Sequence, residues 1–174
     1  MATSISRSPA ETEALGEAWG LEAESGLVIG LCGELGAGKT QLVKGLARGL
    51  GIAARVQSPS FALVNIYAGG RLKLFHLDLY RLDTPGQAFA AGLEEYLQPE
   101  GVTVIEWAEK LCPVPSAECG LPAVAQPARR SAEREGGSAK AGVRNAGGEG
   151  RWRWVRIEVV SETERRIVYE DFGG

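Results

Sequence analysis

The chain has 174 residues, of which 44% are hydrophobic and 24% are charged, and this composition suits one compact soluble domain. Its formal net charge of −3 argues against a general polyanion-binding protein, because nucleic-acid-binding domains usually carry a basic excess. Three cysteines without a CxxC pair and a single histidine argue against a zinc cluster, and the lack of a leader peptide or a long apolar span indicates a cytoplasmic protein without a membrane contact.

The first part of the chain predicts a helix, a strand and a second helix. A loosely helical apolar stripe predicts a helix over residues 9–24. Residues 27–32 form a continuous apolar run between glycines, which is typical of a strand buried on both faces. A glycine-rich loop follows, and apolar residues at helical spacing then predict a helix over 40–50 that ends at Gly51.

The middle of the chain predicts further strands. Two strands, over residues 61–67 and 72–80, are joined by Ala-Gly-Gly, which favours a hairpin turn. A helix is expected over 87–97, and a β-branched apolar run predicts a strand over 102–105 that ends at Glu106. Strands that alternate with helices indicate an α/β fold.

The composition changes after residue 112. Residues 113–150 contain no aromatic residue and are rich in Pro, Gly, Ala, Ser, Arg and Glu, so they bury too little apolar surface to offset their ordering entropy. We therefore expect a disordered insertion inside a single domain that spans 1–174. Order is expected to resume in two strands, over 152–160 and 166–169, which form a C-terminal β-hairpin.

The glycine-rich loop matches the Walker A pattern G-x-x-x-x-G-K-[ST] over its full length, as Gly33, Glu34, Leu35, Gly36, Ala37, Gly38, Lys39 and Thr40. Glycines let backbone N–H groups converge on phosphate oxygens, and the helix that follows points its positive end at the same anion. In this pattern Lys39 reaches the β- and γ-phosphates and the Thr40 hydroxyl binds Mg²⁺. An incidental glycine-rich turn is the alternative, but the buried strand before the loop and the helix after it favour a site for ATP with Mg²⁺.

A P-loop needs a carboxylate at the end of a neighbouring strand, and two candidates occupy such positions. Glu106 closes an apolar strand, and strand alternation puts His76, Asp78 and Tyr80 on one face. The alternative for Glu106 is a solvated charge, and that for Asp78 is a turn cap or a partner for Arg81. For His76 a hydrogen-bonded structural role is the favoured interpretation.

Two further segments carry candidate chemistry. Ser60 lies in a Ser-Pro-Ser-Phe segment between the P-loop helix and the next strand, where a hydroxyl often senses the γ-phosphate through Mg²⁺. An ordinary Ser-Pro turn is the alternative. The run Arg-Trp-Arg-Trp at 151–154 interleaves cations and aromatics as single-stranded nucleic-acid surfaces do, although packing within a strand is the favoured interpretation.

Taken together, these residues resemble the bacterial TsaE (YjeE) family. The matching segments are the loop at 33–40, Ser-Pro-Ser-Phe at 58–61, His-Leu-Asp-Leu-Tyr-Arg-Leu at 76–82, Ile-Glu-Trp at 105–107, and Thr-x-x-Leu-Gly at 12–16. The segment at 76–82 is far more specific than the loop. The family commonly has threonine at the place of Ser60 and aspartate at the place of Glu34.

The resemblance implies a P-loop NTPase-like sheet with flanking helices and an ATPase that helps to make threonylcarbamoyladenosine on tRNA. Such proteins dock on a TsaB–TsaD complex and hydrolyse ATP to support its turnover, with direct RNA contact left open. By this resemblance Thr40 and Glu106 hold Mg²⁺, Asp78 and the Ser60 hydroxyl serve hydrolysis, and Trp107 lies beside the nucleotide.

Two other functions remain open at this point. A small P-loop kinase would transfer phosphate to an acceptor, but the chain looks short for a lid and an acceptor site. A nucleotide-sensing adaptor would bind ATP without turnover. For the ATPase we expect slow hydrolysis alone and activation by a partner, because no obvious arginine finger lies beside the motifs in the sequence, although Arg81 remains a candidate in cis.

Overall fold

The structure is a computed structural model that describes residues 1–97, 99–111 and 151–173, and the insertion predicted at 113–150 lies outside them. The strands are β1 (Ala2–Ser6), β2 (Leu27–Cys32), β3 (Val64–Tyr67), β4 (Leu74–Asp78), β5 (Val102–Glu106), β6 (Arg151–Val159) and β7 (Arg165–Phe172). The helical segments are α1 (Pro9–Glu22), α2 (Lys39–Gly49), α3 (Pro85–Ala90), η1 (Leu93–Leu97) and η2 (Ala108–Lys110). None of these helices is both long and apolar enough to cross a membrane.

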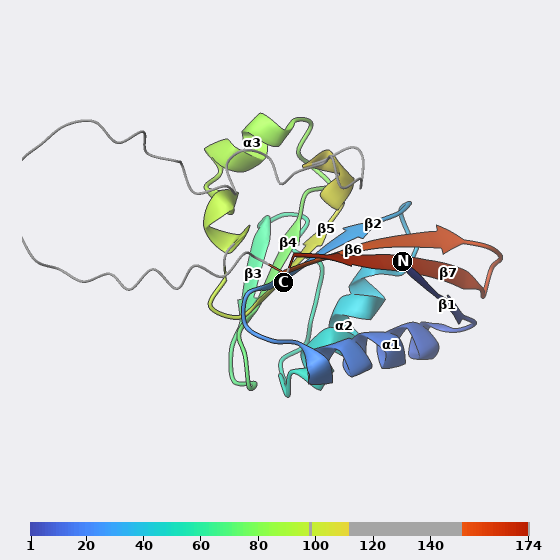
Figure 1. Cartoon of the computed structure of the whole chain (residues 1–174). Coiled ribbons are helices and arrows are strands. Elements are labelled where there is room, and N and C mark those ends of the chain that lie inside the picture. Colours follow the sequence, from blue (N-terminus) through green and yellow to red (C-terminus); the bar gives the residue numbers. More distant parts are fainter. Residues whose placement is uncertain (98, 112–150, 174) are drawn as a thin grey trace, which may run out of the picture.

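The strands form one seven-stranded sheet in the order β1-β7-β6-β2-β5-β4-β3 (Figure 1). The four central strands β6, β2, β5 and β4 are parallel, and antiparallel strands close both ends. Parallel strands end at the same edge, so the loop after β2 lies next to the ends of β5 and β4, where Glu106 and Asp78 are paired in register. The predicted α/β fold and the C-terminal hairpin are both confirmed.

Helices α1 and α2 pack side by side on one face of the sheet (Figure 1). Gly16 lies against the backbone of Leu42 and Gly20 against that of Leu46, so the two helices run parallel. The contact is close, because a Cβ atom on Gly45 would lie 1.9 Å from a backbone carbonyl oxygen of α1. Both helices therefore direct their N-termini, which carry partial positive charge, toward the edge of the sheet that holds the loop.

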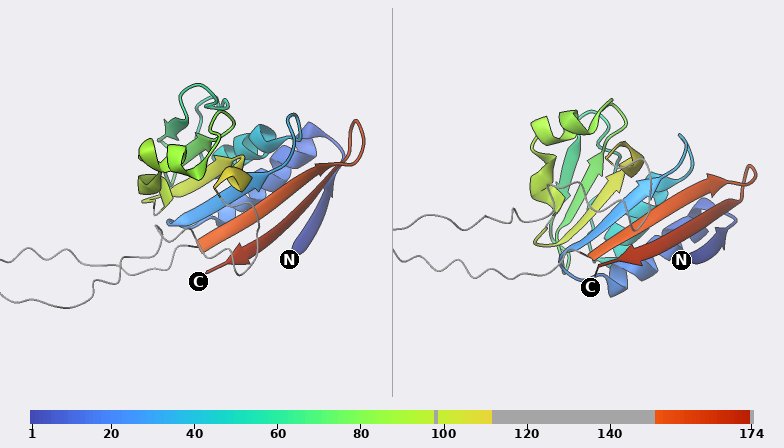
Figure 2. Two further views of the ribbon diagram at one scale, coloured as in Figure 1. Left: turned by 90° about the horizontal axis from the view of Figure 1, so that it is seen from above. Right: turned by 45° about the horizontal axis from the view of Figure 1, so that its top comes forward.

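The opposite face of the sheet is covered over only part of its width. There α3, η1 and η2 pack over β4 and β5 through a second apolar cluster that includes Leu77, Ala88, Leu93, Ile105 and Ala108. Among the described elements no helix covers this face of β6 and β7 (Figure 2). The side chains of β6 that point to this face are therefore free to line a cavity.

The structure corrects several of the predicted elements. The strand predicted over 61–67 begins at Val64, because the two backbone N–H groups before it donate to the carbonyl oxygen of Pro59 and form a turn. The helix predicted over 87–97 is divided at Gly92, whose φ of 73° does not continue a helix. Strand β1 was not predicted, since its sequence carries little apolar signal and its pairing depends on β7.

Candidate functional site

The loop between β2 and α2 has the backbone geometry of a phosphate cradle. Gly33 and Gly38 adopt φ values of 141° and 107°, which side chains with a Cβ rarely adopt. A Cβ on Gly33 would also lie 2.4 Å from the carbonyl oxygen of Ile157. Gly38 is the N-cap of α2 and has no side chain to bond the first N–H groups of the helix. Those groups are therefore available to an anion.

The side chain of Lys39 folds back over the loop. Its Nζ donates hydrogen bonds to the carbonyl oxygens of Gly33 (2.6 Å) and Glu34 (2.9 Å), and it lies 3.8 Å from the centre of the Trp107 ring. Burial lowers the pKa of Lys39, and the negative charge of Glu106 opposes that shift. A phosphate beside this buried ammonium would offset the loss of hydration, so the site favours an anionic ligand.

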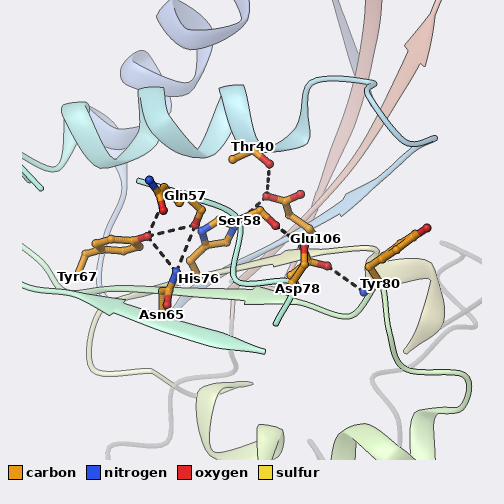
Figure 3. Close-up of polar contacts among 10 residues, drawn as sticks. Thr40, Gln57, Ser58, Asn65, Tyr67, His76, Asp78, Tyr80 and Glu106 are labelled. Carbon is orange, nitrogen blue, oxygen red and sulfur yellow. Dashed lines mark hydrogen bonds and ion pairs between the residues drawn. The ribbon is translucent and has the colours of Figure 1, made fainter. Parts of the chain in front are cut away.

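Glu106 connects the loop to the neighbouring strands (Figure 3). Its Oε1 accepts a hydrogen bond from Thr40 Oγ1 at 2.8 Å and lies 2.9 Å from His76 Nε2. Glu106 is 3% exposed and His76 is fully buried, so the solvated-charge alternative for Glu106 is excluded. His76 is hydrogen-bonded inside the fold, in line with the structural role favoured for it.

The oxygen ligands at this point fit Mg²⁺. Oε1 of Glu106 already has two partners, whereas no described side chain hydrogen-bonds Oε2, which leaves that oxygen for a metal or its water. Within the described ranges no group of three or more His, Cys, Asp or Glu side chains could hold a metal. Thr40 and Glu106 would thus supply two oxygens, and phosphate and water the others.

Asp78 accepts hydrogen bonds on both carboxylate oxygens (Figure 3). Its Oδ2 accepts from Ser58 Oγ at 2.5 Å and from Ser60 Oγ at 2.6 Å, and its Oδ1 accepts from the backbone N–H of Tyr80 at 2.9 Å. The last bond turns the chain out of β4, so the strand predicted over 72–80 ends at Asp78. Asp78 therefore caps a turn and also holds the serine segment beside the loop.

Three aromatic side chains and one arginine border the site. We call these four residues the aromatic rim: Phe61, Tyr80, Arg81 and Trp107. The rings of Tyr80 and Trp107 lie 5.2 Å apart, and the Arg81 guanidinium lies 4.2 Å from the centre of the Phe61 ring. Phe61 is 87% exposed, and Arg81 is exposed with it. Arg81 thus lies against Phe61 and forms no ion pair with Asp78 in the described structure, whereas Trp107 contacts Lys39 directly.

The Arg-Trp-Arg-Trp run at the start of β6 packs within the fold. Trp152 is 9% exposed. The ring of Trp154 packs against Gly30 so closely that a Cβ atom added to Gly30 would lie 2.9 Å from it. Arg153 is paired with Asp171, with its Nε 2.6 Å from Oδ1. These side chains are engaged with the sheet, as the packing interpretation predicts.

Comparison with known proteins identifies the family. A family model described as "Threonylcarbamoyl adenosine biosynthesis protein TsaE" matches residues 6–132. The chain belongs to the TsaE family. Relatives described as tRNA threonylcarbamoyladenosine biosynthesis protein TsaE include that of Synechocystis sp., 45% identical over 60% of this chain and 69% of its own length. Another, from Treponema pallidum, is 46% identical over 62% of this chain and 78% of its own length.

A solved structure supports the same assignment. The crystal structure of YdiB from Bacillus subtilis is similar to this chain with a TM-score of 0.66 and 28% identity, covering 99% of this chain and 86% of the solved one. The TsaE protein of Bacillus subtilis is 43% identical over 58% of this chain and 62% of its own length. The described part of this chain therefore has a fold similar to that of YdiB, and the family model matches residues 6–132.

Two residues of this TsaE-family site were not singled out from the motifs. Ser58 shares the carboxylate of Asp78 with Ser60, and its place in the matched segment is a signal that could have found it. Arg165 donates from Nε to the carbonyl oxygen of Ala37 at 3.2 Å and from Nη1 to that of Ser161 at 2.8 Å. Arg165 thereby ties the β6–β7 turn to the loop across 128 positions, a contact that no local pattern indicates.

Proposed function

We propose that this TsaE-family chain binds ATP with Mg²⁺ and hydrolyses it as an accessory ATPase for a TsaB–TsaD-like complex in threonylcarbamoyladenosine modification of tRNA. The observation that carries the proposal is one cluster at the edge of the sheet, made of Lys39, Thr40, Asp78 and Glu106. The description of the matching family supports the pathway. The chemistry of the cluster supports phosphoryl transfer.

Phosphate binding is assigned to the loop and to the start of α2. Lys39 exchanges the carbonyl oxygens that it now contacts for phosphate oxygens, which bear full negative charge. Thr40 and Glu106 would hold Mg²⁺, which would neutralise the negative charge of the phosphates. Trp107, whose ring lies against the Lys39 ammonium in the free chain, closes that side of the site.

Asp78 is assigned to the attacking water. In the free chain its Oδ2 is occupied by the hydroxyls of Ser58 and Ser60, so it cannot accept a hydrogen bond from water at the same oxygen without a change. Release of the serine segment frees Oδ2 and lets the Ser60 hydroxyl turn toward the γ-phosphate. The chain alone therefore hydrolyses ATP slowly, and ordering of the serine segment is the step that a partner controls.

The aromatic rim is the surface that we assign to that partner. It is contiguous with the serine segment through Phe61, and it includes the exposed ring of that residue. The guanidinium of Arg81 lies over this ring. An arginine supplied by the partner would stabilise the transition state, an effect of about 10³–10⁵ in rate for P-loop enzymes.

The test is the release of inorganic phosphate from ATP, measured with and without TsaB and TsaD homologues from the same organism. We expect the pair to raise the rate, Lys39→Ala to abolish both rates, and Asp78→Asn to abolish turnover while ATP affinity persists. Asp83→Asn is the matched control, because Asp83 is exposed. An unchanged rate with the pair contradicts the accessory role, phosphate on an acceptor indicates a kinase, and binding without turnover indicates an adaptor.

A further inference from the structure

A cavity of about 430 Å³ lies between η2 and β6, on the face of the sheet opposite α2. Residues that line it include Gly33, Glu34, Trp107, Glu109, Trp154 and Arg156. It touches the first residues of the phosphate loop but not Thr40, Asp78 or Glu106. A ligand in this cavity would therefore contact the loop without entering the phosphate cradle.

The walls of the cavity favour a flat cation. Two half-buried indole rings line it, and the ring of Trp107 already has one ammonium, that of Lys39, 3.8 Å from its centre. Ring faces attract cations, and guanidinium most often because it is planar. The thiol of Cys32 adds no charge, since burial raises its pKa and the nearby Glu109 raises it further.

The charges of the lining residues favour the same ligand. Glu34, Glu109 and Glu158 outnumber the one cation among the lining residues, Arg156, which is exposed, together with the Lys39 ammonium that lies against Trp107. Glu158 is paired with Arg166 at 2.7 Å, which leaves Glu34 and Glu109 without an ion-pair partner among the described residues. An anion would meet these carboxylates, so the cavity disfavours phosphate or an acidic peptide.

Two buried polar atoms in the walls have no hydrogen-bond partner in the described structure. They are the acceptor Oε2 of Glu109 and the donor Nε1 of Trp154. A buried polar group without a partner is unfavourable by about 1–3 kcal/mol. Both atoms are covered in the free chain, so a ligand reaches them only if their side chains move. Glu109 is half-buried and lines the cavity, so its carboxylate is the group that a bound cation would contact. An arginine side chain offers the N–H donors that this carboxylate lacks.

We propose that this cavity receives an arginine side chain from a basic segment of the partner protein. The guanidinium donates to the Glu109 carboxylate and stacks on an indole ring. This inference rests on the proposed function, because it names how the partner engages the same loop. Its consequence is that docking brings a cation next to Gly33 and Glu34 and couples the partner to the loop.

The direct test uses acetyl-Gly-Arg-Gly-amide as the probe and the citrulline peptide, which is nearly isosteric but uncharged, as its control. The indole N–H signals of the full-length protein are followed by NMR during each titration. We expect saturable shifts of the Trp107 and Trp154 signals, with roughly three- to tenfold weaker binding for the citrulline peptide and for Glu109→Gln. Glu94→Gln, at an exposed glutamate outside the cavity, should bind like the wild type.

Equal binding of both peptides, or an unchanged affinity in Glu109→Gln, overturns the proposal, as does preferential binding of acetyl-Gly-Glu-Gly-amide. The melting temperature of Glu109→Gln shows whether it is folded, and Trp154→Phe, which removes only the N–H donor and part of the ring, serves as a second variant. ATP binding is measured separately by calorimetry. Wild type that binds ATP but not the arginine peptide refutes this inference alone, whereas wild type that fails to bind ATP refutes the proposed function.

Discussion

Replacement of His76 tests whether its hydrogen bond positions Glu106 for the metal or merely fills the core. His76 Nε2 lies 2.9 Å from Glu106 Oε1, and the two side chains are 0% and 3% exposed. In His76→Leu the buried carboxylate keeps only the hydroxyl of Thr40 as a partner. Loss of a hydrogen bond to a charged group should lower the free energy of unfolding by about 1.5–3 kcal/mol.

The same change should weaken the metal-dependent part of ATP binding. Without its second partner on Oε1, the Glu106 carboxylate is free to turn about the remaining hydrogen bond from Thr40, so Oε2 is no longer fixed in place for the metal. Loss of a group that orients a metal ligand typically costs about 10–100-fold in affinity. His76→Gln is the matched variant, because its amide nitrogen lies the same number of bonds from Cβ as Nε2 does and donates in its place. His76→Asn is one bond too short to do so.

Urea denaturation and calorimetric titration of ATP, with Mg²⁺ or with EDTA, provide the assay. We expect His76→Leu and His76→Asn to lose most of the enhancement of ATP affinity by Mg²⁺, and His76→Gln to recover most of it. In EDTA the ATP affinities of the three variants should be alike. If His76→Leu loses stability while the enhancement by Mg²⁺ is intact, or if Gln and Leu behave alike, the positioning role is wrong.

Four further outcomes are expected. ATP with Mg²⁺ at 100 times its Kd should stabilise the fold by about 2.7 kcal/mol, a melting shift of roughly 5–11 °C, and an equal shift in Lys39→Ala would contradict the phosphate site. Titrations across pH should show ATP affinity falling once the pH exceeds the lowered pKa of Lys39, because phosphate favours the ammonium; a flat profile refutes this. Glu106→Ala should weaken Mg²⁺-dependent binding, whereas Asp78→Asn should lose only single-turnover hydrolysis, so matching profiles would end this division of roles. Gly45→Ala should lower the free energy of unfolding by about 1–3 kcal/mol through the clash with α1, whereas Gly86→Ala, whose nearest neighbour is 3.8 Å away, should change it little in urea denaturation.

Features that depend on a few consecutive residues were predicted from the sequence. The loop at 33–40 carries its chemistry in its own backbone, because glycine positions, a lysine and a hydroxyl act within one turn of chain. The alternation along β4 put His76 and Asp78 on one face, and in the structure both side chains lie on the α2 side of the sheet. Strand and helix types followed from apolar spacing, with errors where Gly92 and the turn at Pro59 end an element early.

The sequence by itself therefore determined which groups can bind phosphate, and only the tertiary structure decided which side chains meet them. Thr40 and Glu106 are 66 positions apart, and they touch because β5 lies next to β2 in the sheet. Any buried apolar strand can in principle pair with any other, so this order depends on the packing of the whole domain and not on a local pattern. For the same reason, the cavity between η2 and β6 and the pairing of β1 with β7 could not be predicted from the sequence. Each joins segments that are distant along the chain, and their contact depends on the packing of the whole domain.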